Sequence, residues 1–302
     1  MSASSPNFVT HVVLGCGDVG RRIVKKLQAG AFVNSQSSFD KAIGLGLKPR
    51  YLELDSLPAS NVKTTKAPHP LIPVLADVAD SYAYYTIAPQ KRGEHDERSR
   101  TLISLLEHAK AIPSKLVLIS TTGVYGDAQG QWIDETHAIN PSTERAKRRC
   151  DSELQWHTFM LKYKRVLSTL RVPGIYARSR LPIERIKKRV PVVRSEEVGF
   201  TNRIHAYDLA AICICANQKV EASTILNASD GKPGTITQYL QTVADYLGEP
   251  ELPEVTLEQA QSMLSEGMLS YLSESRRIRN TKLLRLLDYT FMYPDFRLGI
   301  KY

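Results

Sequence analysis

The feature that most constrains this chain is a glycine-rich turn between an apolar run and an amphipathic segment. Residues 8–14 read as a buried strand, and residues 21–27 carry apolar side chains at helical spacing before Gly30, where we expect the helix to stop. Between them Gly15, Gly17 and Gly20 form a G-x-G-x-x-G pattern. In a strand–turn–helix unit these glycines permit a tight turn, close approach of a pyrophosphate, and packing of the helix on the strand. The spacing therefore predicts a dinucleotide-binding Rossmann unit.

The expected cofactor contacts lie in this loop and at the start of the helix that follows it. Backbone N–H groups and the helix dipole favour phosphate at such a position. The contacts expected there are Gly15, Cys16, Gly17, Asp18, Val19 and Gly20. A turn that needs glycine only for steric reasons and binds nothing is the alternative explanation.

The segment after the second expected strand bears on the choice between NAD and NADP. Residues 33–38 contain no acid that would accept hydrogen bonds from the ribose hydroxyls, and no arginine that would hold a 2′-phosphate. We expect NADP or NAD, with NADP favoured, and Ser37 near the ribose. Asp55, at the end of the third expected strand, is expected beside the adenine, with an aspartate that only closes a turn as the alternative.

Strands and helices alternate along the first part of the chain. Further strands are expected at 31–34, 51–55, 82–87, 115–120 and 166–172, and helices at 99–111 and 143–161. This order predicts an α/β fold with a Rossmann-type, doubly wound parallel sheet. After residue 174 the pattern changes to basic loops, short strands and helices such as 237–247. We therefore expect a dinucleotide-binding domain at 8–174 and a smaller α/β substrate lobe at 175–302, interleaved with the last strands of the sheet.

Five ordered segments resemble the extended short-chain dehydrogenase/reductases, the NAD-dependent epimerase/dehydratase family. They are residues 119–127, 132–141, 171–176, 202–210 and 225–231. The likeness extends from about residue 8 to the C-terminus. It is closest to the atypical YeeZ-like branch, in which G-x-G-x-x-G replaces G-x-x-G-x-x-G. The resemblance implies an NAD(P)-dependent oxidoreductase or epimerase that acts on an anionic or nucleotide-linked substrate.

The resemblance also implies where catalytic residues should lie. Active members use a Ser or Thr, a Tyr, and a Lys four residues after the Tyr that lowers its pKa and holds the ribose. Thr121 falls at the Ser/Thr position. Counting back from Glu153, which matches the family's glutamate, puts Arg145 at the tyrosine position and Arg149 at the lysine position. Arginine is a poor proton donor because its pKa exceeds about 12, so the resemblance implies an atypical active site in which Arg149 holds ribose or phosphate.

Two other residues in the matched segments could take part in proton transfer. Tyr125 is a candidate catalytic residue, although the tyrosine of this segment is usually structural in the family. His205 titrates in the right range, but its match to the family's pattern favours a packing residue beside Asp208.

The formal net charge of +9 raises the question of an anionic partner. In the family, the segment after the sixth strand lines the substrate cleft, so Arg178 and Arg180 are expected to contact a substrate anion. Arg203 is the better single candidate for an anion contact, because it stands beside His205 in a matched segment. A solvated basic helix face is the alternative. Nucleic acid is not expected, because the sequence has neither a recognisable nucleic-acid-binding motif nor a basic tail.

The remaining patterns indicate a cytoplasmic protein with free thiols. No apolar run approaches the roughly 20 residues that cross a bilayer, and the N-terminal residues lack the pattern of a signal peptide. Cys16, Cys150, Cys213 and Cys215 have neither CxxC nor zinc-ligand spacing, so no metal is expected. Cys16 lies where oxidation would disturb the glycine turn. The oligomeric state does not follow from the sequence.

Two functions are compatible with these patterns. The glycine loop and Thr121 favour an oxidoreductase or epimerase. The missing Tyr and Lys favour a protein that binds the cofactor without chemistry, such as a redox sensor or regulatory protein.

Overall fold

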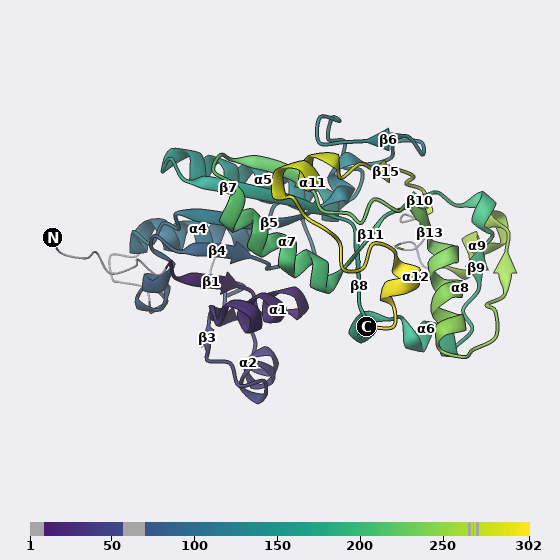
Figure 1. Cartoon of the computed structure of the whole chain (residues 1–302), viewed down its shortest axis with the longest axis horizontal. Coiled ribbons are helices and arrows are strands. Elements are labelled where there is room, and N and C mark those ends of the chain that lie inside the picture. Colours follow the sequence, from purple (N-terminus) through teal and green to yellow (C-terminus); the bar gives the residue numbers. More distant parts are fainter. Residues whose placement is uncertain (1–8, 57–69, 265–266, 268, 270–271) are drawn as a thin grey trace. The chain divides into compact units, whose positions relative to one another are not determined.

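The computed structural model describes residues 9–302 except 57–69, 265–266, 268 and 270–271. Its main element is a seven-stranded sheet with the strand order β12-β7-β5-β4-β1-β2-β3 (Figure 1). The strands are β1 His11–Leu14, β2 Gly30–Val33, β3 Pro49–Tyr51, β4 Tyr82–Tyr85, β5 Lys115–Thr121, β7 Val166–Val172 and β12 Thr224–Asn227. The pairs β1·β2, β1·β4, β2·β3 and β4·β5 are parallel. The predicted doubly wound α/β fold is confirmed.

Helices cover both faces of this sheet. They are α1 Asp18–Leu27, α2 Gln36–Gly44, α4 Glu97–Ala109, α5 Glu144–Lys162 and α7 Ala206–Lys219. On one face, Trp156 of α5 and Leu102 of α4 form a core with Leu116 and Tyr85. Tyr84, whose side chain points the opposite way because strand residues alternate, lies close to α7, where Asn217 is its hydrogen-bond partner. Apolar side chains at alternating strand positions thus bury both faces.

Side-chain caps explain where two of these helices begin. The Asp96 carboxylate accepts a hydrogen bond from the Ser99 N–H at 3.1 Å, and the Thr143 hydroxyl accepts one from the Ala146 N–H at 3.2 Å. Such caps satisfy N–H groups that have no partner within the helix. The helices predicted at 99–111 and 143–161 therefore begin within two residues of the predicted positions.

The predicted elements near the glycine loop need three corrections. Helix α1 ends at Leu27 because Gln28 adopts the left-handed conformation with φ of 51°, and Gly30 is the first residue of β2 and does not stop the helix. Strand β3 ends at Tyr51 and does not run over residues 51–55. Helix α2 was not predicted; its N-cap Ser35 accepts a hydrogen bond from the Ser38 N–H.

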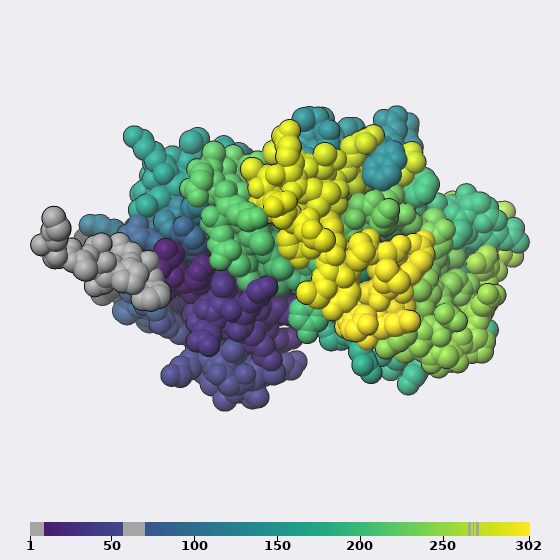
Figure 2. Space-filling view, in the orientation of Figure 1, coloured from purple at the N-terminus to yellow at the C-terminus, as the bar shows by residue number. Residues whose placement is uncertain are grey.

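The chain folds into two compact units, each made of three segments. Unit 1 comprises Met1–Ser120, Thr143–Leu170 and Ala210–Ile225, and unit 2 comprises Thr121–Ser142, Arg171–Leu209 and Leu226–Tyr302. The bounds of these segments differ from the predicted ranges 8–174 and 175–302, of which the second was expected to be interleaved with the last strands of the sheet. The late segment Ala210–Ile225 belongs to unit 1. The Asn217 amide donates to the Ala83 carbonyl at 3.0 Å, and the Lys115 ammonium donates to the Val220 carbonyl at 2.9 Å. Residues 210–225 appear in green in Figure 2, on the same face as the purple N-terminal segments.

Unit 2 is built from short strand pairs and helices around a separate core. The strand pairs are β10·β13 (Phe200–Thr201, Gly234–Thr235), β11·β8 (Arg203–His205, Gly174–Tyr176), β14·β9 (Glu254–Val255, Val192–Val193) and β15·β6 (Arg277–Ile278, Trp132–Ile133). Its helices include α6 Ile183–Lys187, α8 Ile236–Tyr246, α9 Leu257–Met263, α11 Thr281–Leu287 and α12 Phe296–Gly299. Tyr239 and Leu240 of α8 pack with Tyr176 and Phe296 in this core. No helix in the described part of the chain is long and apolar enough to span a membrane.

Candidate functional site

Two glycines of the loop are required by packing inside unit 1. Gly15 has a φ of 98°, and a Cβ there would lie 2.7 Å from Ile87 Cγ1 and 2.9 Å from the Ile87 backbone nitrogen. A Cβ on Gly20 would collide with the Gly15 carbonyl oxygen and lie 3.1 Å from Val13 Cγ1. These distances are shorter than van der Waals contact, so Gly15 and Gly20 let β1, α1 and the segment after β4 come together.

Gly17 differs from these two glycines, because none of the described residues would obstruct a side chain there. Its φ is −73°, and no protein atom of the described structure lies within 4 Å of the position that a Cβ would take. Gly17 is the N-cap of α1, and no side chain caps that helix. The open space lies at a helix N-terminus, where an anion is favoured.

A cavity of about 270 Å³ lies over this loop, at the carboxyl ends of β1, β2 and β4. Its lining residues are Gly15, Cys16, Gly17, Phe32, Val33, Asn34, Ser38, Leu52, Thr86, Ile87, Ala88 and Arg98. In doubly wound sheets ligands bind at the carboxyl ends of the strands. The polar lining groups, the glycine backbone and the helix start suit the adenosine and pyrophosphate part of a dinucleotide.

Not every predicted cofactor contact lies in this cavity. Cys16 lines it between the two glycines, whereas Asp18 pairs with Arg22 at 3.3 Å within α1, and Val19 is buried. Ser37 is exposed and does not line the cavity. Its neighbour Ser38 does, because the first turn of α2 directs that side chain inward.

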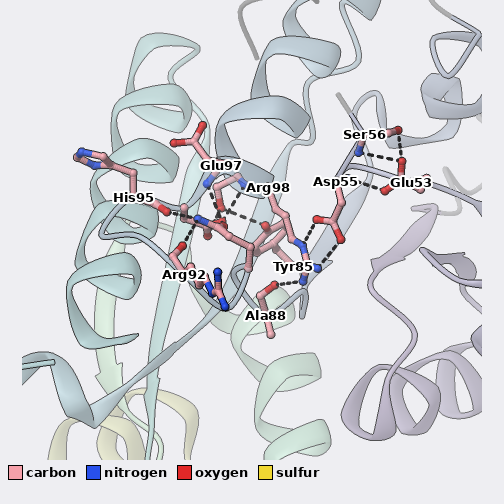
Figure 3. A network of polar contacts seen from close by, with 12 residues as sticks. Glu53, Asp55, Ser56, Tyr85, Ala88, Arg92, His95, Glu97 and Arg98 are labelled. Carbon is pink, nitrogen blue, oxygen red and sulfur yellow. Dashed lines mark hydrogen bonds and ion pairs between the residues drawn. The ribbon is translucent and has the colours of Figure 1, made fainter. Parts of the chain in front are cut away.

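Asp55 forms an ion pair with an arginine that sequence reasoning missed. Arg98, in the first turn of α4, donates from Nε to Asp55 Oδ1 at 2.5 Å and from Nη2 to Oδ2 at 2.6 Å (Figure 3). Its Nη1 donates to the Ala88 carbonyl at 2.8 Å. The paired guanidinium lowers the pKa of Asp55 below its usual range. Arg98 lines the cavity, and Asp55, which was predicted to lie beside the adenine, is not among the lining residues.

Arg149 of α5 bridges the ends of two neighbouring strands. Its Nη1 donates to the Ile87 carbonyl at 3.3 Å and to the Ile119 carbonyl at 3.0 Å. Burial lowers the pKa of its guanidinium, and these carbonyls offset part of the cost of burying the charge. Arg145, one helical turn earlier, is exposed.

The two candidate catalytic residues of unit 2 both make hydrogen bonds within that unit. Thr121 Oγ1 accepts from the Gly123 N–H at 3.1 Å and so caps the 3₁₀ turn η2 Thr122–Tyr125. Tyr125 is fully buried, and its hydroxyl donates to Asn227 Oδ1 at 2.8 Å. Burial raises the pKa of Tyr125. This environment suits a structural tyrosine better than one that exchanges protons.

His205 and Arg203 are both packed inside unit 2. The His205 ring is buried between aromatic rings, with its centroid 4.0 Å from that of Tyr293, and its Nδ1 accepts from the Tyr207 N–H at 3.3 Å. Arg203 is only 6% exposed, and its guanidinium carbon lies 3.8 Å from the centroid of Tyr239. Both therefore have packing roles.

The other two predicted anion contacts are exposed, whereas the cysteine of the glycine loop is buried. Arg178 and Arg180 are exposed in the 3₁₀ turn η3 Arg178–Arg180. Burial raises the pKa of the Cys16 thiol to about 11, so it stays protonated and is a weak nucleophile. Among the described residues, no group of three His, Cys, Asp or Glu side chains is arranged to hold a metal ion.

Solved structures share this architecture over nearly the whole chain. A functionally unknown conserved protein from Silicibacter pomeroyi DSS matches with a TM-score of 0.80 and 22% identity, over 97% of each chain. The chain shares its fold. The same fold occurs in dTDP-glucose 4,6-dehydratase from Bacillus anthracis, solved with NAD (TM-score 0.70, 14% identity, 97% of this chain and 94% of that chain). It also occurs in UDP-glucose 4-epimerase from Thermotoga maritima, solved with UDP-glucose (TM-score 0.73, 15% identity, 97% and 96%). No protein-family model and no curated protein matches the sequence.

Proposed function

We propose that unit 1 binds a nicotinamide dinucleotide, NADP or NAD. The observation that carries this proposal is the cavity over Gly15 and Gly17. At Gly17 the described residues leave the position of a Cβ empty, so a ligand can approach the backbone there. The N–H groups at the start of α1 would hold the pyrophosphate, and Asn34 and Ser38 would face the adenosine half. The B. anthracis dehydratase of the same fold was solved with NAD.

Calorimetric titration of the purified chain with NAD, NADH, NADP and NADPH tests this proposal. We expect saturable binding of at least one of them, with a dissociation constant on the order of 1–100 µM. Adenosine 5′-diphosphate should compete, because the cavity suits the adenosine and pyrophosphate part. Absence of heat and of any thermal shift with all four cofactors would refute the proposal.

A first use of the bound cofactor is an oxidoreductase or epimerase reaction on an anionic or nucleotide-linked substrate. The bound nicotinamide supplies the hydride chemistry. Thr121 favours this role, because a hydroxyl that accepts from Gly123 still has its own hydrogen to donate to a substrate oxygen. Arg178 and Arg180 are exposed, and their positive charges would attract an anion. Turnover of NADPH or NADH with sugar nucleotides, aldehydes or quinones tests it, and a wholly inactive, cofactor-loaded protein would exclude it.

A second use is a regulatory one, in which the protein senses the redox state of the cofactor pool. The arginines at the family's tyrosine and lysine positions favour this use, because neither supplies the usual proton transfer. Arg149 is already bonded to two backbone carbonyls. Proteins captured from a lysate should then differ between the NADP- and NADPH-loaded forms, whereas identical captures would count against a sensor.

Replacing Tyr125 by phenylalanine separates its structural role from a catalytic one. The change leaves the buried Asn227 Oδ1 without its donor, so we expect a loss of about 1–3 kcal/mol in the free energy of unfolding. Cofactor affinity should not change. As a control, Tyr163→Phe removes a weaker, 3.4 Å bond to Glu107 and should cost less. Loss of turnover by Tyr125→Phe without loss of stability would contradict the structural role.

A further inference from the structure

The electrostatic character of the cavity comes from one side chain. Arg98 is the one charged residue among the described residues that line it; the others are glycines, apolar side chains, Cys16, Asn34, Ser38 and Thr86. Its partner Asp55 does not line the cavity, and neither does any other acidic residue that the structure describes. A ligand therefore meets a cation and no carboxylate at the wall formed by α4.

The hydrogen bonds of Arg98 leave part of its guanidinium for a ligand. A guanidinium has five N–H donors. Three are used: Nε and Nη2 donate to the two carboxylate oxygens of Asp55, and Nη1 donates to the Ala88 carbonyl. The other two donors, one on each terminal nitrogen, make no hydrogen bond to the described residues. Donors on the two terminal nitrogens can pair with oxygens of a phosphate group.

The orientation of this guanidinium is set by its partners. The bidentate bonds to Asp55 at 2.5 and 2.6 Å and the bond to Ala88 hold it through three of its N–H groups (Figure 3). Hydrogen bonding to Asp55 raises the pKa of Arg98 and lowers that of Asp55, so both groups stay charged near neutral pH. A pre-oriented donor pair loses little conformational entropy when a ligand binds.

We propose that Arg98 selects NADP over NAD by binding the phosphate on the adenosine ribose, with Asp55 as its positioning residue. This inference rests on the proposed binding of a nicotinamide dinucleotide. The segment after β2, where such a phosphate is commonly held, contains no arginine or lysine between Val33 and Ser38. Arg98 supplies from α4 the cation that this segment lacks.

The test compares NADP and NAD binding by calorimetry in wild type and variants. We expect wild type to bind NADP at least about 10-fold more tightly, and Arg98→Gln to weaken NADP binding about 10- to 100-fold, since charge-assisted hydrogen bonds are lost. NAD affinity should stay within about 3-fold, because NAD lacks this phosphate. Arg98→Lys, which keeps the charge but not the fork, and Asp55→Asn, which keeps Arg98 but not its orientation, should each lose part of the preference.

The matched control is Arg100→Gln, which removes an arginine of the same helix that pairs with Asp151 at 2.5 Å and does not line the cavity. It should leave both affinities unchanged. Thermal melting checks that each variant is folded. If Arg98→Gln does not fold, the comparison is made with Arg98→Lys.

Several results would overturn the inference. If Arg98→Gln lost affinity equally for NAD and NADP, Arg98 would contact a part that both cofactors share. If neither affinity changed, Arg98 would not contact the cofactor. Adenosine 2′,5′-bisphosphate should bind wild type more tightly than the 3′,5′-isomer, and the reverse order would exclude a 2′-phosphate site. If wild type bound none of these nucleotides, the proposed function itself would fail. If it bound NAD and NADP equally well, only the selectivity would fail.

Discussion

Replacing Gly17 by alanine is expected to weaken dinucleotide binding at least about 10-fold while the protein stays folded. A methyl group at Gly17 meets no protein atom within 4 Å, so its main effect is to occupy space that a pyrophosphate needs. Because the φ of −73° suits alanine, the free energy of unfolding should change by less than about 1 kcal/mol. Calorimetry and urea unfolding measure the two effects separately.

The same substitution at Gly20 should instead destabilise the fold. The added methyl group collides with the Gly15 carbonyl oxygen, which belongs to the backbone and has little freedom to move. We expect a loss of about 2–4 kcal/mol. Gly44→Ala, at the end of α2 with open space around it, is the control and should change neither property. Normal cofactor affinity in Gly17→Ala would show that the pyrophosphate does not lie against this loop.

Stability is expected to fall as the pH rises from about 4 to about 7, because of one buried carboxyl group in unit 2. Asp230 is 6% exposed, and its Oδ1 accepts from the Lys232 N–H at 2.9 Å. Burial is the main reason that its pKa rises from the usual 3.8 to about 7; the hydrogen bond from Lys232 and the charge of Arg203 oppose the shift, whereas Asp295 and Asp208 raise the pKa further.

The sign of this pH dependence follows from proton uptake. Between the two pKa values the folded protein binds more protons at Asp230 than the unfolded chain does, so folding is favoured at the acidic end. The contribution of Asp230 to the free energy of unfolding is fully present below pH 3.8 and is lost as the pH rises through about 7. Above that pH it no longer changes. The shift corresponds to up to about 4 kcal/mol.

Asp230→Asn should therefore flatten the pH profile and stabilise the protein at pH 8 by about 1–3 kcal/mol. The asparagine carbonyl oxygen still accepts from Lys232, so the turn is kept. Asp245→Asn, an exposed carboxyl of α8, is the control and should leave the profile unchanged. Urea unfolding at pH 5 and pH 8 measures both. An unaltered slope in Asp230→Asn would show that another group causes the pH dependence.

The sequence predicted the parts of this protein that depend on local pattern. Gly15, Gly17 and Gly20 lie between the end of β1 and the first turn of α1, so their spacing alone indicates the loop. Strands β5 and β7 and helices α4 and α5 were found because their apolar residues repeat at strand or helix spacing. The doubly wound sheet follows from the order of these elements.

Long-range pairing was decided by the tertiary structure alone. Asp55 and Arg98 are 43 residues apart, and no local pattern relates a turn aspartate to an arginine in the first turn of a helix. Arg149 likewise bonds to Ile87 and Ile119, which are 62 and 30 residues away, and Tyr125 bonds to Asn227, which is 102 residues away. These pairs form because parallel strands bring their carboxyl ends to one edge of the sheet, whatever their separation along the chain. The sequence by itself therefore determined a dinucleotide-binding loop and a doubly wound sheet. Only the tertiary structure decided which charged side chain faces the cavity, because that depends on how distant strands and helices pack.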